Sequence, residues 1–101
     1  MNQGIYISGK ITGLSRLEVV EKFEAAEQKL KGFGYSHIIN PVKLDHTKNT
    51  NEDYDQYMKT DIKGMMDCNT LYVLPCWKDS KGAKIELQLA IALNYNIIWG
   101  N

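Results

Sequence analysis

Apolar positions along the chain follow two different spacings. Short runs of β-branched and aromatic residues occur at 4–8, 37–39, 70–75 and 96–99, and polar or turn-forming residues bound each run. These runs predict four short, buried strands. Between them, apolar residues recur every three or four positions, which predicts helices from Ser15 to Gly32, over 52–66 and over 81–94.

The first predicted helix has the clearest boundaries. Ser15 precedes Glu18 by three residues, which is the spacing of a capping box, and Gly32 and Gly34 follow the last apolar residue of the stripe. Residues 43–51 are polar and form either a lid over a ligand or only a long connection.

The alternation of strands and helices predicts one α/β domain over residues 1–101. Near-continuous apolar strands favour a parallel sheet covered on both faces, a flavodoxin/Rossmann-like three-layer sandwich with strand order 2-1-3-4. Ligands of such sheets bind beyond the carboxyl ends of the strands, where the strand order reverses. The segments 9–13 and 76–82 follow the two strands at that point, so they are the expected site.

Two carboxylates occupy unexpected helix faces. At about 100° per residue, Glu86 lies roughly opposite Lys84 and Gln88, among Leu89, Ala90 and Leu93. By the same geometry, Asp61 falls inside the apolar stripe of its helix, between Tyr57 and Met65. A buried carboxylate costs several kcal/mol unless it is paired or neutralised, so something must compensate each of them.

Paired carboxylates suit the cleavage of a glycosidic bond. One carboxylate stabilises or attacks the anomeric carbon, while the other, protonated, gives its proton to the leaving group. The alternative is structural, in which each acid caps a neighbouring element or hydrogen-bonds a Tyr or Lys. Both interpretations stay open from the residues alone.

Charge and composition exclude several classes of function. Twelve basic and twelve acidic residues give a net charge of zero without a basic stripe, which argues against binding to duplex nucleic acid. The sequence holds no apolar run of membrane-spanning length and no secretory signal. Cys68 and Cys76 bracket one predicted strand and read as reduced thiols rather than metal ligands, so we expect a cytoplasmic protein without a metal.

Several segments together resemble one known family. They are Tyr6-Ile7-Ser8-Gly9-Lys10-Ile11-Thr12-Gly13, Asn40-Pro41, Tyr57 with Asp61, Leu74-Pro75-Cys76-Trp77, and Ser80-Lys81-Gly82-Ala83-Lys84-Ile85-Glu86. The chain resembles an uncharacterised short subfamily of the nucleoside 2-deoxyribosyltransferase-like proteins, which include 2-deoxynucleoside 5-monophosphate N-glycosidases. The resemblance covers nearly the whole chain.

The resemblance implies a role for each matching position. Glu86 is the nucleophile on the anomeric carbon, Asp61 handles the proton of the base, and Tyr6 holds the nucleophilic carboxylate. Gly9 lets the backbone approach the ligand, and Ser80 contacts the sugar or a phosphate. The further substrate-binding candidates are Lys10, Ile11, Trp77 and Gly82, and no cofactor is expected.

Two departures from the family pattern leave a second function open. Asn69 stands where related sequences have an aspartate, and Lys10 stands where the monophosphate hydrolases have a small hydroxyl residue. A non-catalytic nucleotide-binding module is therefore the alternative, and an interaction protein is a third possibility. Trp77 either stacks on a base or covers the end of the sheet. The apolar segment 83–93 also predicts a homodimer or a higher homo-oligomer.

Overall fold

Four parallel strands form the centre of the molecule. The computed structural model describes residues 4–44 and 54–100. The strands are β1 (Ile5–Ser8), β2 (Ile38–Ile39), β3 (Thr70–Val73) and β4 (Asn96–Trp99). They form one sheet in the order β2-β1-β3-β4, with all neighbouring pairs parallel, which confirms the predicted order.

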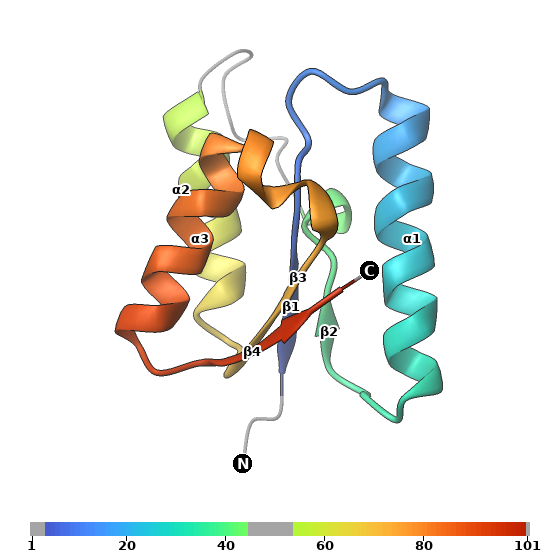
Figure 1. The fold of residues 1–101 in the computed structure, drawn as a ribbon, viewed down its shortest axis with the longest axis vertical. Helices are drawn as coiled ribbons and strands as arrows, with labels where there is room; N and C mark the ends of the chain where they lie inside the picture. Colours follow the sequence, from blue (N-terminus) through green and yellow to red (C-terminus); the bar gives the residue numbers. More distant parts are fainter. Residues whose placement is uncertain (1–3, 45–53, 101) are drawn as a thin grey trace.

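Helices cover both faces of this sheet. The α-helices are α1 (Arg16–Gly32), α2 (Tyr54–Met65) and α3 (Lys81–Ala92), and two 3-10 helices are η1 (Pro41–Lys43) and η2 (Pro75–Asp79). Figure 1 shows α1 on one face and α2 with α3 on the other. The predicted α/β three-layer sandwich is therefore confirmed.

Alternation along β1 divides the core into two halves. Ile5 and Ile7 pack with Phe23 and Leu30 of α1 on one face. Tyr6 faces the other way, into a cluster that includes Met65 at the end of α2 and Leu87 of α3. Because side chains of a strand alternate between faces, Ser8 shares the α2 and α3 side with Tyr6.

Several element boundaries differ from the prediction. The strand expected over 70–75 ends at Val73, and Pro75 begins η2, because proline has no N–H to donate to a sheet. The helix expected to reach residue 94 ends at Ala92, with Asn94 at φ 61°. Leu93 is therefore not an inward residue, since its side chain is 47% exposed. The segment 43–51, for which a lid and a long connection were both open, lies mostly outside the described residues.

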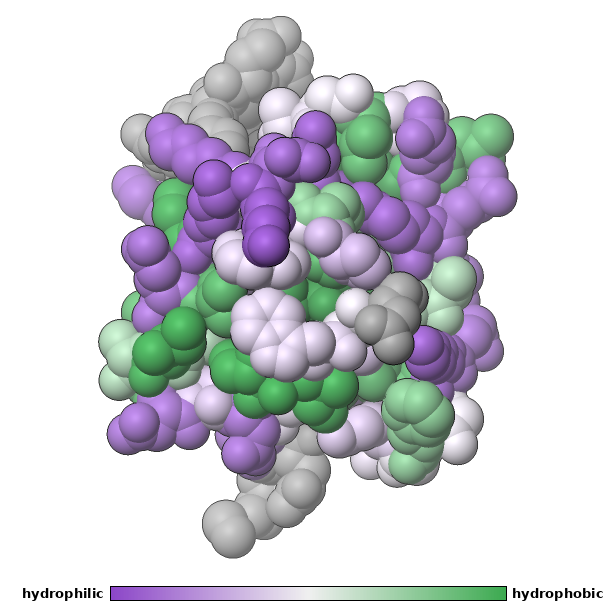
Figure 2. All heavy atoms as spheres, in the orientation of Figure 1, coloured by the Kyte–Doolittle hydropathy of each residue, from purple (hydrophilic) through white to green (hydrophobic). Residues whose placement is uncertain are grey.

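The surface carries a group of exposed apolar side chains. Ile91, Leu93 and Trp99 are all about half exposed or more, near the end of α3 and on β4. In Figure 2, apolar side chains gather over the lower part of α3 and around β4. Among the residues that the structure describes, no helix is both long and apolar enough to cross a bilayer.

Candidate functional site

The carboxylate of Glu86 is buried at the centre of the site. Its side chain extends from α3 toward the underside of β1 and is only 5% exposed. The Tyr6 hydroxyl donates to Oε2 at 2.8 Å, and the Ser8 hydroxyl donates to Oε1 at 2.7 Å. Each carboxylate oxygen therefore has a hydroxyl donor from β1, and the two donors fix the orientation of the carboxylate.

Burial changes the acidity of both partners in this contact. It raises the pKa of Glu86 to about 7, although the hydrogen bonds from Ser8 and Tyr6 oppose the rise and the charge of Asp61 adds to it. The pKa of Tyr6 also lies well above its usual value, first because the ring is buried and then because Glu86 and Asp61 are close. Tyr6 therefore stays protonated and remains a donor.

Asp61 enters the same site from α2. Its side chain is 6% exposed, and its charge raises the pKa of both Glu86 and Tyr6. Asp61 and Glu86 line one cavity of about 680 Å³. The structure thus brings together the two inward acids that helical spacing singled out, and places Tyr6 beside them.

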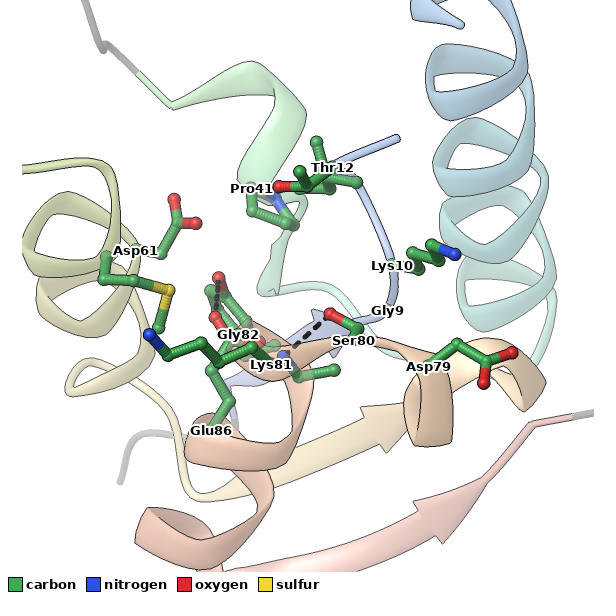
Figure 3. A pocket seen from close by; sticks show the side chains of 14 residues that line it. Gly9, Lys10, Thr12, Pro41, Asp61, Asp79, Ser80, Lys81, Gly82 and Glu86 are labelled. Atoms are coloured by element: carbon green, nitrogen blue, oxygen red, sulfur yellow. Dashed lines mark hydrogen bonds between the residues drawn. The ribbon is translucent and has the colours of Figure 1, made fainter. Parts of the chain in front are cut away.

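Two loops at the carboxyl ends of β1 and β3 complete the cavity. All but one of the substrate-binding candidates line it: Gly9, Lys10, Ile11, Ser80 and Gly82. Figure 3 shows the Lys81 side chain extending across the cavity toward α2, while Lys10 and Asp79 extend away from Asp61 and Glu86. The cavity therefore has a carboxylate side and an opposite side formed by the segment that follows β1.

Ser80 has a structural role at this edge. It is the N-cap of α3, where its hydroxyl oxygen accepts from the Ala83 N–H at 3.1 Å. The hydroxyl hydrogen can still donate to another group, since a serine hydroxyl both donates and accepts. The first turn of α3 also lines the cavity, through Lys81, Gly82 and Ala83. The positive end of the helix dipole there favours an anionic part of a ligand.

Gly9 is required by packing as well as by any ligand. A Cβ atom at this position would lie 2.7 Å from Leu74 Cδ1 and 3.0 Å from Leu74 Cβ. The backbone after β1 therefore passes against the residue that follows β3. This contact brings the two cavity loops close together.

Trp77 lies outside the cavity. Its ring packs against Trp99 of β4, with 5.7 Å between the ring centroids and an interplanar angle of 48°. It is half-buried at the edge of the core cluster beneath α3. Of the two roles considered for Trp77, covering the end of the sheet agrees with this position.

Several residues of the site were not candidates from the sequence. Ser8 is the most important, and the signal was available, because it lies two residues after Tyr6 on the same face of β1. Among the other lining residues, Thr12, Asp79 and Lys81 lie within the predicted segments 9–13 and 76–82. Pro41, Met58 and Ala83 lie outside these segments and were not named as candidates.

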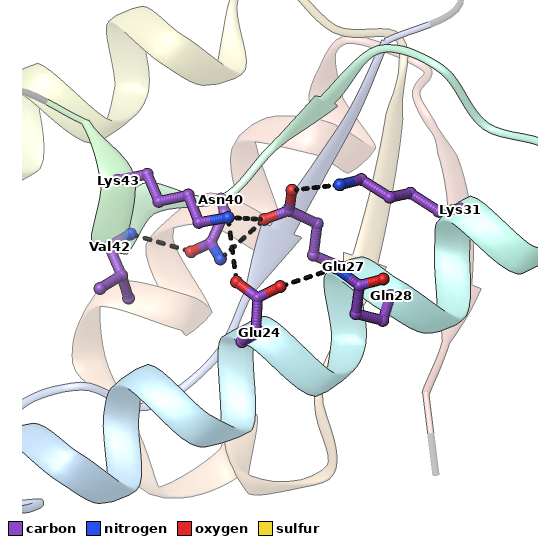
Figure 4. Close-up of polar contacts among 7 residues, drawn as sticks. All are labelled: Glu24, Glu27, Gln28, Lys31, Asn40, Val42 and Lys43. Atoms are coloured by element: carbon purple, nitrogen blue, oxygen red, sulfur yellow. Dashed lines mark hydrogen bonds and ion pairs between the residues drawn. The ribbon is translucent and has the colours of Figure 1, made fainter.

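A third buried acid, Glu27, lies close to the cavity wall at Pro41. Glu27 of α1 is 8% exposed and accepts from Asn40 Nδ2 at 3.1 Å, with Lys43 Nζ at 2.9 Å and Lys31 Nζ at 3.4 Å (Figure 4). Burial alone would raise the pKa of Glu27, but these three partners outweigh it and hold the pKa below its usual value. Glu27 is thus an ionised structural carboxylate that ties η1 to α1.

Side chains that could bind a metal ion are not grouped together in the described residues. In residues 4–44 and 54–100, no group of three or more His, Cys, Asp or Glu side chains is arranged to hold a metal ion.

Comparison with known proteins assigns the chain to a family. The profile of DUF4406, described as a domain of unknown function, matches residues 3–99. The chain belongs to the DUF4406 family. No curated protein and no solved structure matches it. All residues that line the cavity of this DUF4406 domain lie within the range that the family profile matches.

Proposed function

We propose that this domain breaks the N-glycosidic bond of a 2-deoxynucleoside or its 5-monophosphate, with Glu86 as the nucleophile. The observation that supports the proposal is the buried Glu86 carboxylate, held between Tyr6 and Ser8, in one cavity with Asp61. Two carboxylates in a half-enclosed, partly apolar cavity suit a reaction that needs a nucleophile and an acid.

The proposed reaction has two steps. A Glu86 oxygen attacks the anomeric carbon and forms an ester, while the carbon–nitrogen bond breaks and its electron pair goes to the base. Asp61 supplies the proton that the departing base takes up. Water, or a second base in the transferase version, then attacks the anomeric carbon, and the ester bond to that carbon breaks to release Glu86. Asp61, deprotonated in the first step, takes up the proton of the attacking group.

The surroundings of Glu86 suit this role. The Tyr6 and Ser8 hydroxyls leave the carboxylate little rotational freedom, so a substrate meets a nucleophile of fixed orientation. Because the pKa of Glu86 is about 7, its ionised fraction increases as the pH passes through neutrality. The nucleophilic, ionised form of Glu86 therefore increases toward mildly alkaline pH, whereas the acid step needs Asp61 in its protonated form.

A panel of deoxynucleosides and deoxynucleotides tests the proposal. Each compound is incubated with wild-type protein and with Glu86→Ala, and free base is measured by chromatography. We expect release by the wild type and its loss in the variant. Undiminished release by Glu86→Ala, or no release at all, contradicts the proposal. Thermal stabilisation by nucleotides without any release identifies the non-catalytic binding module instead.

Two further expectations belong to this proposal. A homodimer would cover the apolar side chains of Ile91, Leu93 and Trp99, and light scattering at micromolar concentration tests it, with a monomer as the contradicting result. A small nucleoside or nucleotide as substrate, with no added cofactor and a cytoplasmic location, remains a prediction from the sequence.

A further inference from the structure

Lys22 of α1 connects the two loops that line the cavity. Its ammonium group donates to Cys76 Sγ at 2.9 Å and to the Lys10 carbonyl oxygen at 3.1 Å. The backbone N–H of Lys10 also donates to Cys76 Sγ, at 3.3 Å. A sulfur atom in η2, an ammonium group on α1 and the backbone after β1 thus meet at one point.

This meeting point opens to a second hollow, separate from the carboxylate cavity. The hollow has a volume of about 650 Å³, and its lining residues are Lys10, Leu14, Glu18, Glu21, Lys22, Cys76 and Asp79. Cys76 is partly exposed there, so a small molecule can approach its sulfur. Three acids and two lysines are among these lining residues, and Lys22 is the charged side chain with a contact to the sulfur.

The two cysteines of the chain have opposite environments. Partial burial alone would raise the pKa of Cys76, but the Lys22 ammonium and the Lys10 N–H outweigh burial and lower it. Burial and the charge of Asp67 raise the pKa of Cys68 to about 11, and its side chain is 7% exposed. Cys68 is therefore an internal control for any reaction at Cys76.

We infer that Cys76 and Lys22 form a reactive thiolate–ammonium pair, and that Cys76 is a covalent modification site for small neutral electrophiles, including hydrogen peroxide. With peroxide, the thiolate sulfur attacks one oxygen, the O–O bond breaks, and hydroxide leaves and takes a proton to become water. The sulfur is oxidised to a sulfenic acid and the peroxide is reduced. With iodoacetamide, a sulfur–carbon bond forms and iodide leaves.

Modification would alter the carboxylate cavity through Lys10. Modification changes the size and charge of the sulfur group that Lys22 contacts, so the contact that holds the loop after β1 against η2 weakens. Lys10 lines both hollows, and Ser80 follows η2 directly. We therefore expect modification of Cys76 to weaken nucleotide binding, a consequence that rests on the proposed function, whereas the reactivity itself does not.

The test is limited alkylation of the folded protein by iodoacetamide at pH 7, read by peptide mass spectrometry. The pKa of Cys68 is about 11, so at pH 7 Cys68 has about 100-fold less thiolate than a cysteine at the ordinary value of 9.0. A thiolate of higher pKa is more nucleophilic, which offsets about tenfold of this difference in rate. We expect Cys76 to react at least about tenfold faster than Cys68. Equal rates, or a faster reaction at Cys68, overturn the proposal.

Substitutions test the role of Lys22. We expect Lys22→Met to slow alkylation of Cys76 several-fold and Lys22→Arg to preserve it, since arginine retains the charge. Lys29→Met, which removes an exposed lysine from the same helix, is the matched control and leaves the rate unchanged. An unchanged alkylation rate of Cys76 in Lys22→Met overturns the assignment of Lys22 as its activating partner.

Nucleotide binding of the alkylated protein is measured separately by thermal shift. If alkylation is fast but nucleotide binding is unchanged, the expected effect of modification on the cavity is contradicted, whereas the reactivity of Cys76 stands. Absence of nucleotide binding by the unmodified protein contradicts the proposed function and leaves the reactivity result intact.

Discussion

The Tyr6 hydroxyl donates a 2.8 Å hydrogen bond to Glu86 Oε2 across 80 positions of the sequence. This contact joins the central strand to α3, and both side chains are buried. Since Tyr6 stays protonated, the contact orients the carboxylate without neutralising its charge. In these contacts the buried carboxylate receives hydrogen bonds from two neutral hydroxyls rather than from a cation.

Glu86 makes the stability of the domain depend on pH. Its pKa is about 7 in the folded protein against an ordinary value of 4.5, so protonated Glu86 favours the folded state. This contribution is fully present below about pH 4.5 and is lost as the pH rises through about 7, an amount on the order of 3 kcal/mol. Glu86→Gln removes the titration, so denaturant unfolding at pH 5 and pH 8 should differ much less in the variant. An equal pH dependence in both proteins contradicts the raised pKa.

Ser8 should control the acidity of Glu86. Its hydrogen bond stabilises the charged carboxylate, so Ser8→Ala should raise the pKa of Glu86 further and move the midpoint of the pH dependence upward by roughly one unit. The midpoint is read from unfolding free energies measured across pH 4 to 9. Ser15→Ala, which removes an exposed serine that caps α1, is the control and should leave the midpoint in place. A midpoint that does not move in Ser8→Ala would show that the contact is weak.

Glu27 should be structural and should titrate in a different range. Glu27→Gln weakens the contacts to Lys43 and Lys31 and should cost about 1–3 kcal/mol of unfolding free energy at pH 7. Because its pKa is lowered in the fold, this stability is present above the ordinary pKa and is lost only as the pH falls below that value. Glu24→Gln, at the more exposed partner of Lys43, should destabilise the domain less than Glu27→Gln, because solvent screens an exposed ion pair. An equal loss in the two variants contradicts the assignment.

A side chain at position 9 should lower the stability of the domain. Gly9→Ala places a Cβ at 2.7 Å from Leu74 Cδ1, so Leu74 or the backbone must move, at a cost of about 1–3 kcal/mol. Gly32→Ala is the matched control, because a Cβ there has nothing within 4 Å and alanine favours the helix. Thermal unfolding compares the two. The account is contradicted if Gly9→Ala is as stable as Gly32→Ala.

The fold and much of the cavity follow from periodicity in the sequence. Strand and helix spacing give the sheet order, and the inward positions of Asp61 and Glu86 direct attention to α2 and α3. The sequence left the position of Trp77 open between two roles, because Trp77 lies in a 3-10 helix that begins at Pro75, and the structure packs its ring against Trp99. Turn geometry of this kind leaves no periodic signal.

The inward-acid argument also shows why sequence alone is insufficient. Glu27 lies four residues after buried Phe23, so the same helical reasoning identifies it as an inward acid. Its partners are Lys43 and Asn40, which only the folded chain brings to α1. Glu27 is compensated by cations and Glu86 by hydroxyls, and this difference between a structural and a candidate catalytic acid appears only in three dimensions.

The most direct test is base release by Glu86→Gln on the substrate that the wild type cleaves best. Glutamine nearly preserves the size of the side chain but cannot act as the nucleophile, so the account predicts a loss of at least about 1,000-fold. Asp67→Asn, at an exposed acid just beyond α2, controls for loss of negative charge and should retain wild-type activity. Release by Glu86→Gln at the wild-type rate would contradict the assignment of Glu86 as the nucleophile.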